Sequence, residues 1–503
     1  MGGLRLERRA ALCALLTCSL ALVAASEARA ESRATWTQRA LALQYSLASD
    51  VPLRNAPWVY THNSFNSKAE MGPTLSDTDQ NQRISITDQL DHGVRHLEID
   101  THWFHNQAVV CHALDNHFGC SIEKSLRTVL GEVRVWLRAN PTQVLLIYLE
   151  SHLDNETGYG AGAAAIQQTL GDLVMRPPGG GSECAPLPLS LTRDEIRGKR
   201  KQVLLMGPCG VGKAWQSWVF DESLRKTGHT NATFRPFPDC GPDFTRRQYD
   251  AYVIRYYEDS TKLTQTTNAG GTDPVTAPIA TAMIRCGVDV IGFDQLLPDD
   301  PRLTAVVWSW APGEPGSGSC ALQRSDGRWV SRPCGERHRV ACRDRGLGWR
   351  VPKGTVPAAS APRLCASPRL RSAVPRTGYG GQLLRVAQQR AGAASVWLGY
   401  RRAGGTWQRY ERAGCGPRLA QPRRRWPVRN GVARFRVRLR FACTGERLHR
   451  RIVVRGDKRL VRGRSFALVK VPVRRGTRRL RVRYRYGGRR HRATVRLRLR
   501  RSA

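Results

Sequence analysis

Five short apolar runs in the sequence each lead to a polar residue that can take part in acid–base or metal chemistry. The runs are 58–60, 94–99, 108–111, 144–149 and 288–293, and the polar residues are His62, Asp100, His112, Glu150 and Asp294. Short, continuous apolar runs are typical of strands that are covered on both faces of a parallel sheet. A (β/α) barrel carries its chemistry at the carboxyl ends of successive parallel strands. The pattern therefore predicts a TIM-type α/β barrel and indicates which face holds the reactive residues.

Helical patterns separate these runs. Between residues 122 and 137, Leu126, Val129, Val133 and Leu137 recur at helical spacing, and Asn140-Pro141 ends the helix. Alternating strands and helices over residues 31–302 are typical of βα units. We therefore assign this range to the barrel.

The rest of the chain has two further patterns. Residues 303–415 are dense in Trp, Gly and Cys and predict few helices, whereas Arg and apolar residues alternate strictly from about residue 428 onward. A period of two predicts half-buried antiparallel strands with the apolar residues inside and Arg outside. We expect residues 416–503 to form a basic, all-β, sandwich-like domain, for which Cys415 and Cys443 are candidate disulfide partners.

The amino-terminal segment predicts export. Three arginines up to Arg9 precede an apolar stretch over 10–25, and Ala28-Arg29-Ala30 has the small residues of a cleavage site before Glu31. With residues 1–30 removed as a signal peptide, 12 of the 14 cysteines remain. An even number of cysteines in an exported chain predicts disulfides and a secreted protein.

The charge is concentrated in the tail. The formal net charge of the chain is +41, and residues 401–503 hold 36 Arg and Lys against three acids. Such a tail attracts anionic lipid headgroups, binds nucleic acid or acidic polysaccharide without sequence specificity, or is only a solvated face. We favour peripheral contact with an anionic membrane and expect no specific nucleic-acid partner.

The acids of the predicted barrel mouth indicate a metal site. Strand periodicity places Glu98 and Asp100 on one face of a strand, where two carboxylates repel unless a cation neutralises them. A hard divalent cation with oxygen ligands fits, and Asn63 and Glu150 can complete its site. His62 and His112 would flank it as base and acid for phosphoryl transfer. We interpret His92, His96, His102, His105 and His117 as non-catalytic.

The segment from Thr61 to His152 resembles the X region of phosphatidylinositol-specific phospholipase C. The matching pieces are Thr61-His62-Asn63-Ser64-Phe65, Gln89 to Asp100, Val110-Cys111-His112 and Leu149-Glu150-Ser151-His152. The calcium-dependent branch of that family has His-Asn, Glu-x-Asp, His and Glu in this order, and the metal-independent bacterial branch has Arg where Asp100 stands.

The resemblance implies a distorted TIM barrel and assigns roles to these residues. The metal ligands would be Asn63, Glu98, Asp100 and Glu150. His112 would be the general acid toward the leaving alcohol, and His62 would stabilise the phosphoryl group or act as base. Asp294 is expected to orient a histidine. The metal implied is Ca²⁺, with Mg²⁺ as an alternative.

The middle region resembles a C-type lectin-like α+β domain whose halves are in permuted order. Residues 308–315 and the cysteines up to Cys342 resemble the second half of that fold, while Cys365 and Val396-Trp397-Leu398-Gly399-Tyr400 resemble the first half. The resemblance predicts the disulfides Cys320–Cys334 and Cys342–Cys365. The sugar-binding calcium ligands of the fold are absent from the sequence.

The leading hypothesis is a secreted phosphoric diester hydrolase or lyase that cleaves a phospholipid headgroup. A glycerophosphodiesterase or a sphingomyelinase D-like barrel is a rival, because those enzymes also combine two histidines with a Glu-x-Asp metal pair. A surface-binding protein with a degenerate barrel is a rival of another class. The products formed from a panel of lipids separate the phospholipase C-like hypothesis from the glycerophosphodiesterase or sphingomyelinase D-like one. Equal activity of a His112→Ala variant and of wild type would support the surface-binding protein.

Overall fold

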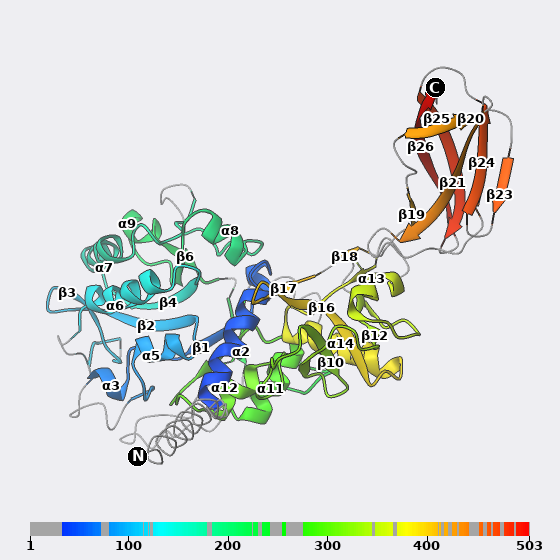
Figure 1. Ribbon diagram of the computed structural model, residues 1–503. Helices are drawn as coiled ribbons and strands as arrows, with labels where there is room; N and C mark the ends of the chain where they lie inside the picture. Colours follow the sequence, from blue (N-terminus) through cyan, green and yellow to red (C-terminus); the bar gives the residue numbers. More distant parts are fainter. Residues whose placement is uncertain are drawn as a thin grey trace, which may run out of the picture.

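The computed structural model describes most of the chain between Arg33 and Arg501 (Figure 1). The described residues are 33–71, 80–113, 115–118, 120, 124–178, 184–223, 225–229, 234–241, 254–257, 275–344, 348–365, 370–410, 412–413, 417–420, 425–429, 432–441, 452–455, 460–463, 466–472, 477–486 and 489–501. The predicted signal peptide and both Cys415 and Cys443 lie outside them.

Eight parallel strands form the barrel sheet. They are β1 (Trp58–Thr61), β2 (His96–Phe104), β4 (Leu145–His152), β5 (Val203–Gly207), β6 (Val219–Asp221), β7 (Arg225–His229), β8 (Ile254–Tyr257) and β9 (Val290–Phe293). Their order in the sheet is β6-β5-β4-β2-β1-β9-β8-β7. Apart from β3, which lies between β2 and β4 in the chain, neighbouring strands are consecutive, and the first strand pairs with the last. That arrangement is a TIM-like barrel in which the described residues form no ladder between β6 and β7.

One predicted barrel strand has a different role. The run 108–111 corresponds to β3 (Gln107–Val110), which pairs antiparallel with β2 rather than parallel to it. The two strands are joined at His105 and Asn106, whose φ angles of 47° and 56° suit the tight turn of a β-hairpin. Because Thr101 pairs with Val110, the hairpin returns the chain to the level of Asp100. His112 therefore reaches the barrel mouth by a hairpin, which corrects the expectation of a parallel strand.

Helices cover the outside of this sheet. They are α2 (Arg33–Leu47), α3 (Lys68–Met71), α5 (Ile86–Asp91), α6 (Leu126–Ala139), α7 (Glu156–Thr169), α8 (Arg193–Gly198), α9 (Lys213–Gln216), α11 (Ala277–Cys286) and α12 (Pro301–Val306), with a 3₁₀ turn at Leu53–Asn55. The predicted apolar face of α6 is confirmed, because Leu126, Val129, Val133 and Leu137 are all buried. Ser125 caps its amino end by accepting a hydrogen bond from the Thr128 backbone N–H.

Two apolar layers hold the barrel together. Alternate strand residues face inward, where Trp58, Tyr60, Leu146, Leu204 and others pack around the barrel axis. The intervening residues, among them Leu97 and Ile99, pack outward against the helices. The outer layer continues without a break into Trp308, Trp310 and Trp329 of the following region.

The middle region contains two small sheets. One holds β10 (Cys320–Arg324), β11 (Trp329–Arg332), β12 (Arg339–Val340), β16 (Ser395–Ala403) and β17 (Thr406–Arg409), and the other holds β13 (Cys342–Arg343), β14 (Trp349–Arg350), β15 (Arg371–Ser372) and β18 (Arg412–Ala413). Helix α14 (Gly378–Arg390) packs against α11, and α13 (Ala361–Leu364) follows a 3₁₀ turn at Ala358–Ser360. The predicted disulfides Cys320–Cys334 and Cys342–Cys365 are both present.

The tail is an all-β sheet. Its strands are β19 (Pro417–Ala420), β20 (Arg425–Arg429), β21 (Val432–Phe441), β22 (Ile452–Arg455), β23 (Leu460–Gly463), β24 (Phe466–Pro472), β25 (Thr477–Tyr486) and β26 (Arg489–Arg501). All of the recorded pairings are antiparallel except that of β20 with β26.

Disulfides are spread over the barrel and the middle region. In addition to the two above, Cys111–Cys120, Cys184–Cys209 and Cys240–Cys286 are bonded. Structural disulfides of this number indicate an oxidising, extracytoplasmic compartment. Among the described residues, none of the helices has both the length and the apolar character needed to cross a membrane.

Candidate active site

Three carboxylates converge at the carboxyl ends of β2 and β4. One oxygen from each of Glu98, Asp100 and Glu150 lies within 4.8 Å of the others. The register of the sheet causes this, because Asp100 of β2 pairs directly with Glu150 of β4 and Glu98 lies two residues earlier on the same face. Glu98 and Asp100 are 2% and 5% exposed, so both carboxylates lie in an environment of low dielectric. Buried acids at this separation repel each other strongly unless a cation or a proton compensates them.

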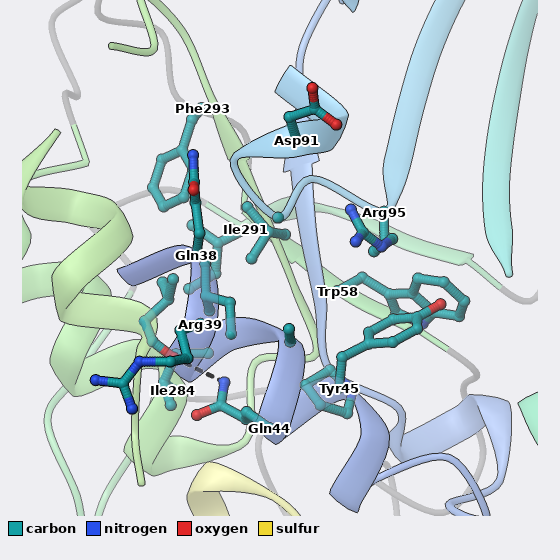
Figure 2. Close-up of a pocket in the computed structure, with 16 residues that line it drawn as sticks. Gln38, Arg39, Gln44, Tyr45, Trp58, Asp91, Arg95, Ile284, Ile291 and Phe293 are labelled. Atoms are coloured by element: carbon teal, nitrogen blue, oxygen red, sulfur yellow. Dashed lines mark hydrogen bonds between the residues drawn. The ribbon is translucent and has the colours of Figure 1, made fainter. Parts of the chain in front are cut away.

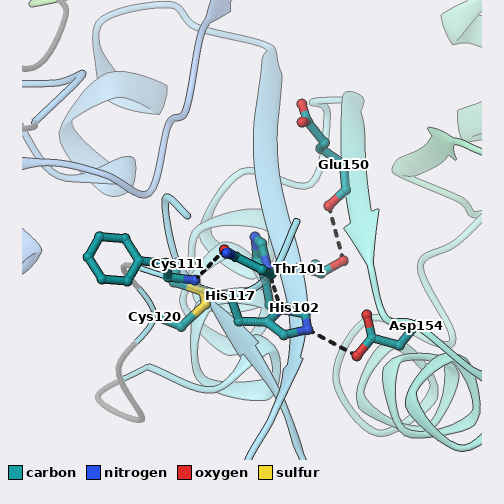
Figure 3. The surroundings of a disulfide bond; sticks show 9 residues. Thr101, His102, Cys111, His117, Cys120, Glu150 and Asp154 are labelled. Atoms are coloured by element: carbon teal, nitrogen blue, oxygen red, sulfur yellow. Dashed lines mark hydrogen bonds and ion pairs between the residues drawn. A yellow bond between two sulfur atoms is a disulfide. The ribbon is translucent and has the colours of Figure 1, made fainter. Parts of the chain in front are cut away.

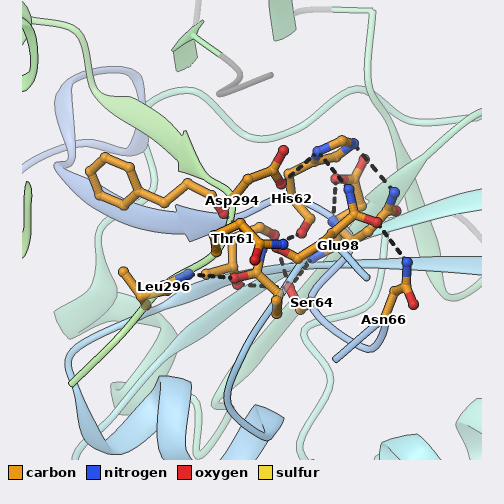
Figure 4. A network of polar contacts seen from close by, with 12 residues as sticks. Thr61, His62, Ser64, Asn66, Glu98, Asp294 and Leu296 are labelled. Carbon is orange, nitrogen blue, oxygen red and sulfur yellow. Dashed lines mark hydrogen bonds and ion pairs between the residues drawn. The ribbon is translucent and has the colours of Figure 1, made fainter. Parts of the chain in front are cut away.

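Glu98 is fixed by the residues of β1 and the turn that follows it. Its Oε2 accepts hydrogen bonds from the Tyr60 hydroxyl and from the Asn63 backbone N–H, the latter at 3.0 Å. Its backbone N–H donates to Ser64 Oγ at 2.9 Å, and the Ser64 N–H donates to the Glu98 carbonyl. Figure 4 shows Glu98 with Ser64 and the neighbouring polar residues. One Glu98 oxygen is therefore held by protein donors, and the carboxylate is oriented before any ligand arrives.

Asn63 brings an amide to the same cluster. It has a φ of 44°, a left-handed conformation that Asn adopts more readily than most residues and that is enriched at functional sites. Its side-chain amide lies 2.9 Å from both oxygens of Asp100. With its nitrogen toward Asp100 the amide donates two hydrogen bonds, and with its oxygen toward Asp100 it extends an all-oxygen ligand set. Three carboxylates and one amide oxygen are the donors that Ca²⁺ and Mg²⁺ prefer, so these residues fit a hard divalent cation.

His62 is oriented by Asp294. Its Nδ1 lies 3.0 Å from Asp294 Oδ1, and Asp294 is completely buried just after β9. Arg302 donates from Nη2 to the Asp294 backbone carbonyl at 2.7 Å and forms an ion pair with Asp300. Because Nδ1 is paired with this carboxylate, the ring is oriented and Nε2 is the nitrogen that could accept a proton. This arrangement is common for histidines that act as bases.

Two amides connect His62 to His112. Asn81 Nδ2 lies 3.5 Å from His62 Nδ1, and Asn81 Oδ1 accepts a hydrogen bond of 2.7 Å from Asn66 Nδ2. Asn66 Nδ2 also lies 3.3 Å from His112 Nδ1. The two histidines are thus tied to one polar network although 50 positions separate them in the sequence. Gln82 supports it by donating from Nε2 to the backbone carbonyls of His62 and Phe293.

The segment that carries His112 is held down by a disulfide and by histidine–carboxylate pairs. Cys111, next to His112, is bonded to Cys120, and Figure 3 shows the surrounding residues. His117 Nε2 lies 3.0 Å from Asp154 Oδ2, and its Nδ1 lies 3.0 Å from Nδ1 of His102.

His152 joins this segment to the carboxylate cluster. Its Nδ1 lies 2.8 Å from Asp115 Oδ1, and its Nε2 lies 3.3 Å from Glu150 Oε1. The hydrogen bond to Glu150, opposed by burial and helped by the charges of Glu150 and Asp115, raises the pKa of His152. His102 stacks on His152 with ring centroids 4.5 Å apart, and burial, together with the neighbouring imidazoles, lowers the pKa of His102 to about 4. In this stack His102 is therefore the neutral ring, and His152 is the ring that holds a proton more readily.

The structure brings together every residue that the sequence assigned to the site. The carboxylates of Glu98, Asp100 and Glu150 and the amide of Asn63 form one cluster, His62 lies against Asp294, and His112 joins them through Asn66. The cluster that combines His102 with Cys111 and Cys120 is not a further metal site, because these two cysteines are bonded to each other.

Sequence reasoning missed the residues that position this set. They are Tyr60, Asn66, Asn81, Gln82, Asp115, Asp154 and His152. Only His152 had a signal, since it lies two positions after Glu150 and therefore on the same strand face. The amides lie in loops, where neither periodicity nor spacing predicts a contact.

A cavity of about 310 Å³ lies elsewhere, between α2 and the outer face of β1 and β9 (Figure 2). Its polar groups already bind the protein itself. Arg95 donates from Nη1 to the Leu90 and Val94 carbonyls, and Gln44 donates to the Val306 carbonyl. The reactive groups of the barrel therefore converge at its mouth and not in this cavity.

Parts of this chain are similar to known proteins. The plant "PI-PLC X domain-containing protein At5g67130" of Arabidopsis thaliana is 33% identical over 116 residues, which cover 22% of this chain and 27% of the plant protein. Among solved structures, phosphatidylinositol-specific phospholipase C from Listeria monocytogenes aligns with 55% of this chain and 98% of its own, at 14% identity and a TM-score of 0.36. A Staphylococcus aureus phosphatidylinositol-specific phospholipase C aligns with 55% of this chain and 97% of its own, at 13% identity and a TM-score of 0.37.

A longer match extends beyond the barrel. "Uncharacterized protein Rv2075c" of Mycobacterium tuberculosis is 39% identical over 393 residues, covering 73% of this chain and 80% of the relative. A family model described as the Rv2075c PI-PLC-like domain matches residues 18–300, more than half of the chain. With its barrel and the ordered His-Asn, Glu-x-Asp, His and Glu set in place, the chain belongs to the Rv2075c PI-PLC-like domain family.

Proposed function

We propose that this protein is an exported phosphodiesterase that cleaves the headgroup of a phospholipid by histidine acid–base catalysis beside a divalent cation. The observation that carries the proposal is the convergence of one oxygen-ligand cluster and two histidines on a single polar network. The family, whose domain is described as PI-PLC-like, and the similarity to a plant PI-PLC X-domain protein support the reaction class.

Each residue has a role in the proposed reaction. A substrate hydroxyl attacks phosphorus, and Nε2 of His62 takes its proton while Asp294 stabilises the ring that becomes charged. His112 gives a proton to the oxygen of the departing diacylglycerol, so that one P–O bond forms as another breaks. Asn66 contacts Nδ1 of His112, so Nε2 is the nitrogen that would give its proton to the leaving group. When the hydroxyl belongs to inositol, the product is a cyclic phosphate.

The cation would be held by Asn63, Glu98, Asp100 and Glu150. We propose Ca²⁺, with Mg²⁺ as the alternative, and it would stabilise negative charge on the phosphoryl oxygens. The protein's contribution is to hold the oxygens of Glu98 and Asp100 oriented toward a common point.

The rim of the mouth supports a lipid substrate. The exposed large apolar side chains among the described residues are Phe118, Val135, Val211 and Leu297. Phe118, Val211 and Leu297 lie in loops after β3, β5 and β9, on the side of the barrel where the site opens, and they are 77%, 50% and 46% exposed. Apolar groups around a polar site suit an interfacial substrate whose acyl chains stay in a bilayer.

The test is phosphodiester cleavage on phosphatidylinositol vesicles. Wild-type protein, His112→Ala and the control His105→Asn, which alters the exposed hairpin turn, are compared with calcium and with chelator. We expect calcium-dependent release of inositol phosphate from wild type and control and a loss of at least about 10²-fold in His112→Ala. Equal rates for all three proteins would refute the assigned acid.

A wider lipid panel separates the rival functions. Release of a free headgroup alcohol from sphingomyelin or from glycerophosphodiesters would instead assign the barrel to the glycerophosphodiesterase or sphingomyelinase D-like class. Binding of lipid without any cleavage would favour the surface-binding alternative.

A further inference from the structure

The register of the tail sheet gathers arginines at adjoining positions. In the ladder of β25 and β26, Arg483 is opposite Arg492 and Arg485 is opposite Arg490. Strand periodicity continues this face along both strands, and the ladder with β20 extends it by pairing Arg498 with Arg425. On the other side, β22 adds Arg455 opposite Arg481. Basic positions therefore adjoin one another across four neighbouring strands.

The positions of this face whose exposure the structure describes are exposed, and its strands lack acids. Arg483, Arg492 and Thr494 occupy adjacent positions on it, and all three are exposed. None of the eight described strands of the tail contains Asp or Glu. Like charges that are directly opposite in a sheet destabilise it, so the array is most stable when anions cover it.

The geometry favours a surface over a single polyanionic strand. Neighbouring strands lie about 4.8 Å apart, and residues on the same face recur about every 6.8 Å along a strand, so the array extends in two directions. Proteins that bind single-stranded nucleic acid place aromatic residues between their basic residues. In β25 the aromatic position next to Arg483 instead lies on the opposite face of the sheet. Tyr484 pairs with His491 and Ile452, on the face opposite to Arg483.

We propose that this array, centred on Arg483 and Arg492, binds the headgroup plane of an anionic phospholipid bilayer and holds the protein on a membrane. Guanidinium groups form paired hydrogen bonds with phosphate oxygens, and a basic group near an anionic surface contributes about 1 kcal/mol. The choice of a bilayer among anionic surfaces rests in part on the proposed function, because that function places the substrate in a membrane.

The test uses the full chain with chelator present to suppress cleavage. Partition onto phosphatidylcholine vesicles with 30 mol% phosphatidylglycerol is compared with partition onto pure phosphatidylcholine for wild type and for two quadruple variants. The variants replace Arg483, Arg485, Arg490 and Arg492 by Gln or by Lys. At about 1 kcal/mol for each neutralised residue, we expect the Gln variant to bind anionic vesicles between about 10-fold and 10³-fold more weakly. The Lys variant should stay within about threefold.

Vesicle binding by wild-type protein alone gives a second test, which a folding defect in a variant cannot affect. The protein's binding to anionic vesicles must be much tighter than its binding to neutral vesicles, and must weaken steeply as salt rises from 50 to 500 mM. Unchanged binding by the Gln variant would overturn the proposal. So would tight binding of heparin or single-stranded DNA at 150 mM salt with no binding of anionic vesicles.

The two proposals fail in different ways. A Gln variant that no longer binds vesicles but still cleaves a short-chain, monomeric phosphatidylinositol separates attachment from catalysis. If wild type binds anionic vesicles through the array and cleaves none of the lipids offered, the proposed function fails and the array remains.

Discussion

At the scale of single residues, Asp294 offers the sharpest test of the acid–base assignment. It is fully buried and holds His62 Nδ1 at 3.0 Å. Asp294→Asn keeps the shape but removes the charge that stabilises the protonated ring, so we expect kcat to fall by about 10²- to 10⁴-fold with little change in KM. Steady-state kinetics on a monomeric substrate measures this. A change in KM alone would show that Asp294 serves binding and not proton transfer.

His152 gives a second prediction, which concerns metal affinity. Its Nε2 lies 3.3 Å from Glu150 and its Nδ1 is paired with Asp115 on the His112 segment. Groups that orient a metal ligand affect affinity by about 10- to 100-fold, so His152→Gln should weaken calcium binding by that factor. Isothermal titration calorimetry measures the binding directly, with His105→Asn as the matched control. Equal calcium affinities for the two variants would show that His152 does not support the metal site.

The sequence predicted the residues of the carboxylate cluster better than the residues that support them. Strand periodicity alone places Glu98 and Asp100 together, and the order of the strands adds Glu150. Tyr60 is also on an inward position of β1, but nothing in the sequence says that its hydroxyl reaches Glu98. Asn66 and Asn81 act through loop conformation, which depends on tertiary contacts that have no local signature.

At the scale of elements, the segment closed by Cys111 and Cys120 positions His112, the proposed general acid. Replacing both cysteines by Ser removes a short covalent loop beside His112, which we expect to cost about 2–3 kcal/mol of unfolding free energy. The effect on kcat should be larger than the effect on KM, because the loop holds His112, the proposed acid. Thermal unfolding and kinetics of the double variant measure both. Loss of stability with full kcat would mean that the disulfide serves only the fold.

The apolar rim gives a prediction at the same scale. Phe118 is 77% exposed in the segment that follows β3. Phe118→Ser removes an apolar side chain that would enter the bilayer, so we expect cleavage on vesicles to fall about 10-fold or more. The rate on a monomeric short-chain substrate should be unchanged. Val135→Ser, on the outer helix α6, is the control, and an equal loss in both variants would argue against the rim.

The hairpin explains why one element differed from its prediction. An apolar run of four residues fits a barrel strand and a hairpin strand equally well. The direction of β3 is set by the turn at His105-Asn106, where both φ angles are positive, and neither residue is the glycine that usually marks such a turn. Helix α6 and strands β1, β2, β4 and β9, in contrast, followed directly from their apolar patterns.

At the scale of the whole molecule, Asp50 joins the barrel to the middle region. Its Oδ2 accepts from Arg376 at 2.8 Å and from Arg409 at 2.6 Å. Burial raises the pKa of Asp50, but the hydrogen bonds and charges of Arg409 and Arg376 outweigh it and leave the pKa below its ordinary value of 3.8. A lowered folded-state pKa stabilises the protein above the unfolded value, and that contribution is lost as the pH falls through the folded value.

The lowered pKa of Asp50 leads to a prediction about stability. Asp50→Asn should lose on the order of 1 kcal/mol of unfolding free energy at pH 7, and the difference from wild type should shrink below about pH 4. Chemical unfolding between pH 7 and pH 3 measures this. Asp172→Asn, which breaks a more exposed ion pair with Arg134, is the control and should change little. Equal losses in both variants would contradict a special role for Asp50.

The barrel and the middle region also share their apolar core, which the sequence did not indicate. Trp36 of α2 donates from Nε1 to the Glu314 carbonyl, and Gln44 accepts from the Trp308 backbone N–H. Gly378 at the start of α14 packs so closely on Ile284 that a Cβ there would lie 2.5 Å from the Ile284 carbonyl oxygen. A change in composition near residue 302 predicted two regions, but composition says nothing about how much surface two regions bury together.

The pairing of β1 with β9 has a consequence for how such proteins evolve. It places the entrance and the exit of the barrel chain side by side, and α2 and α12 lie in contact there, joined by Thr37 and Thr304. New segments can be appended at this point without passing the mouth where Glu98 and His112 lie. Evolution can therefore replace a domain attached at this point by another, and so direct the protein to a new location, without changing the residues at the barrel mouth.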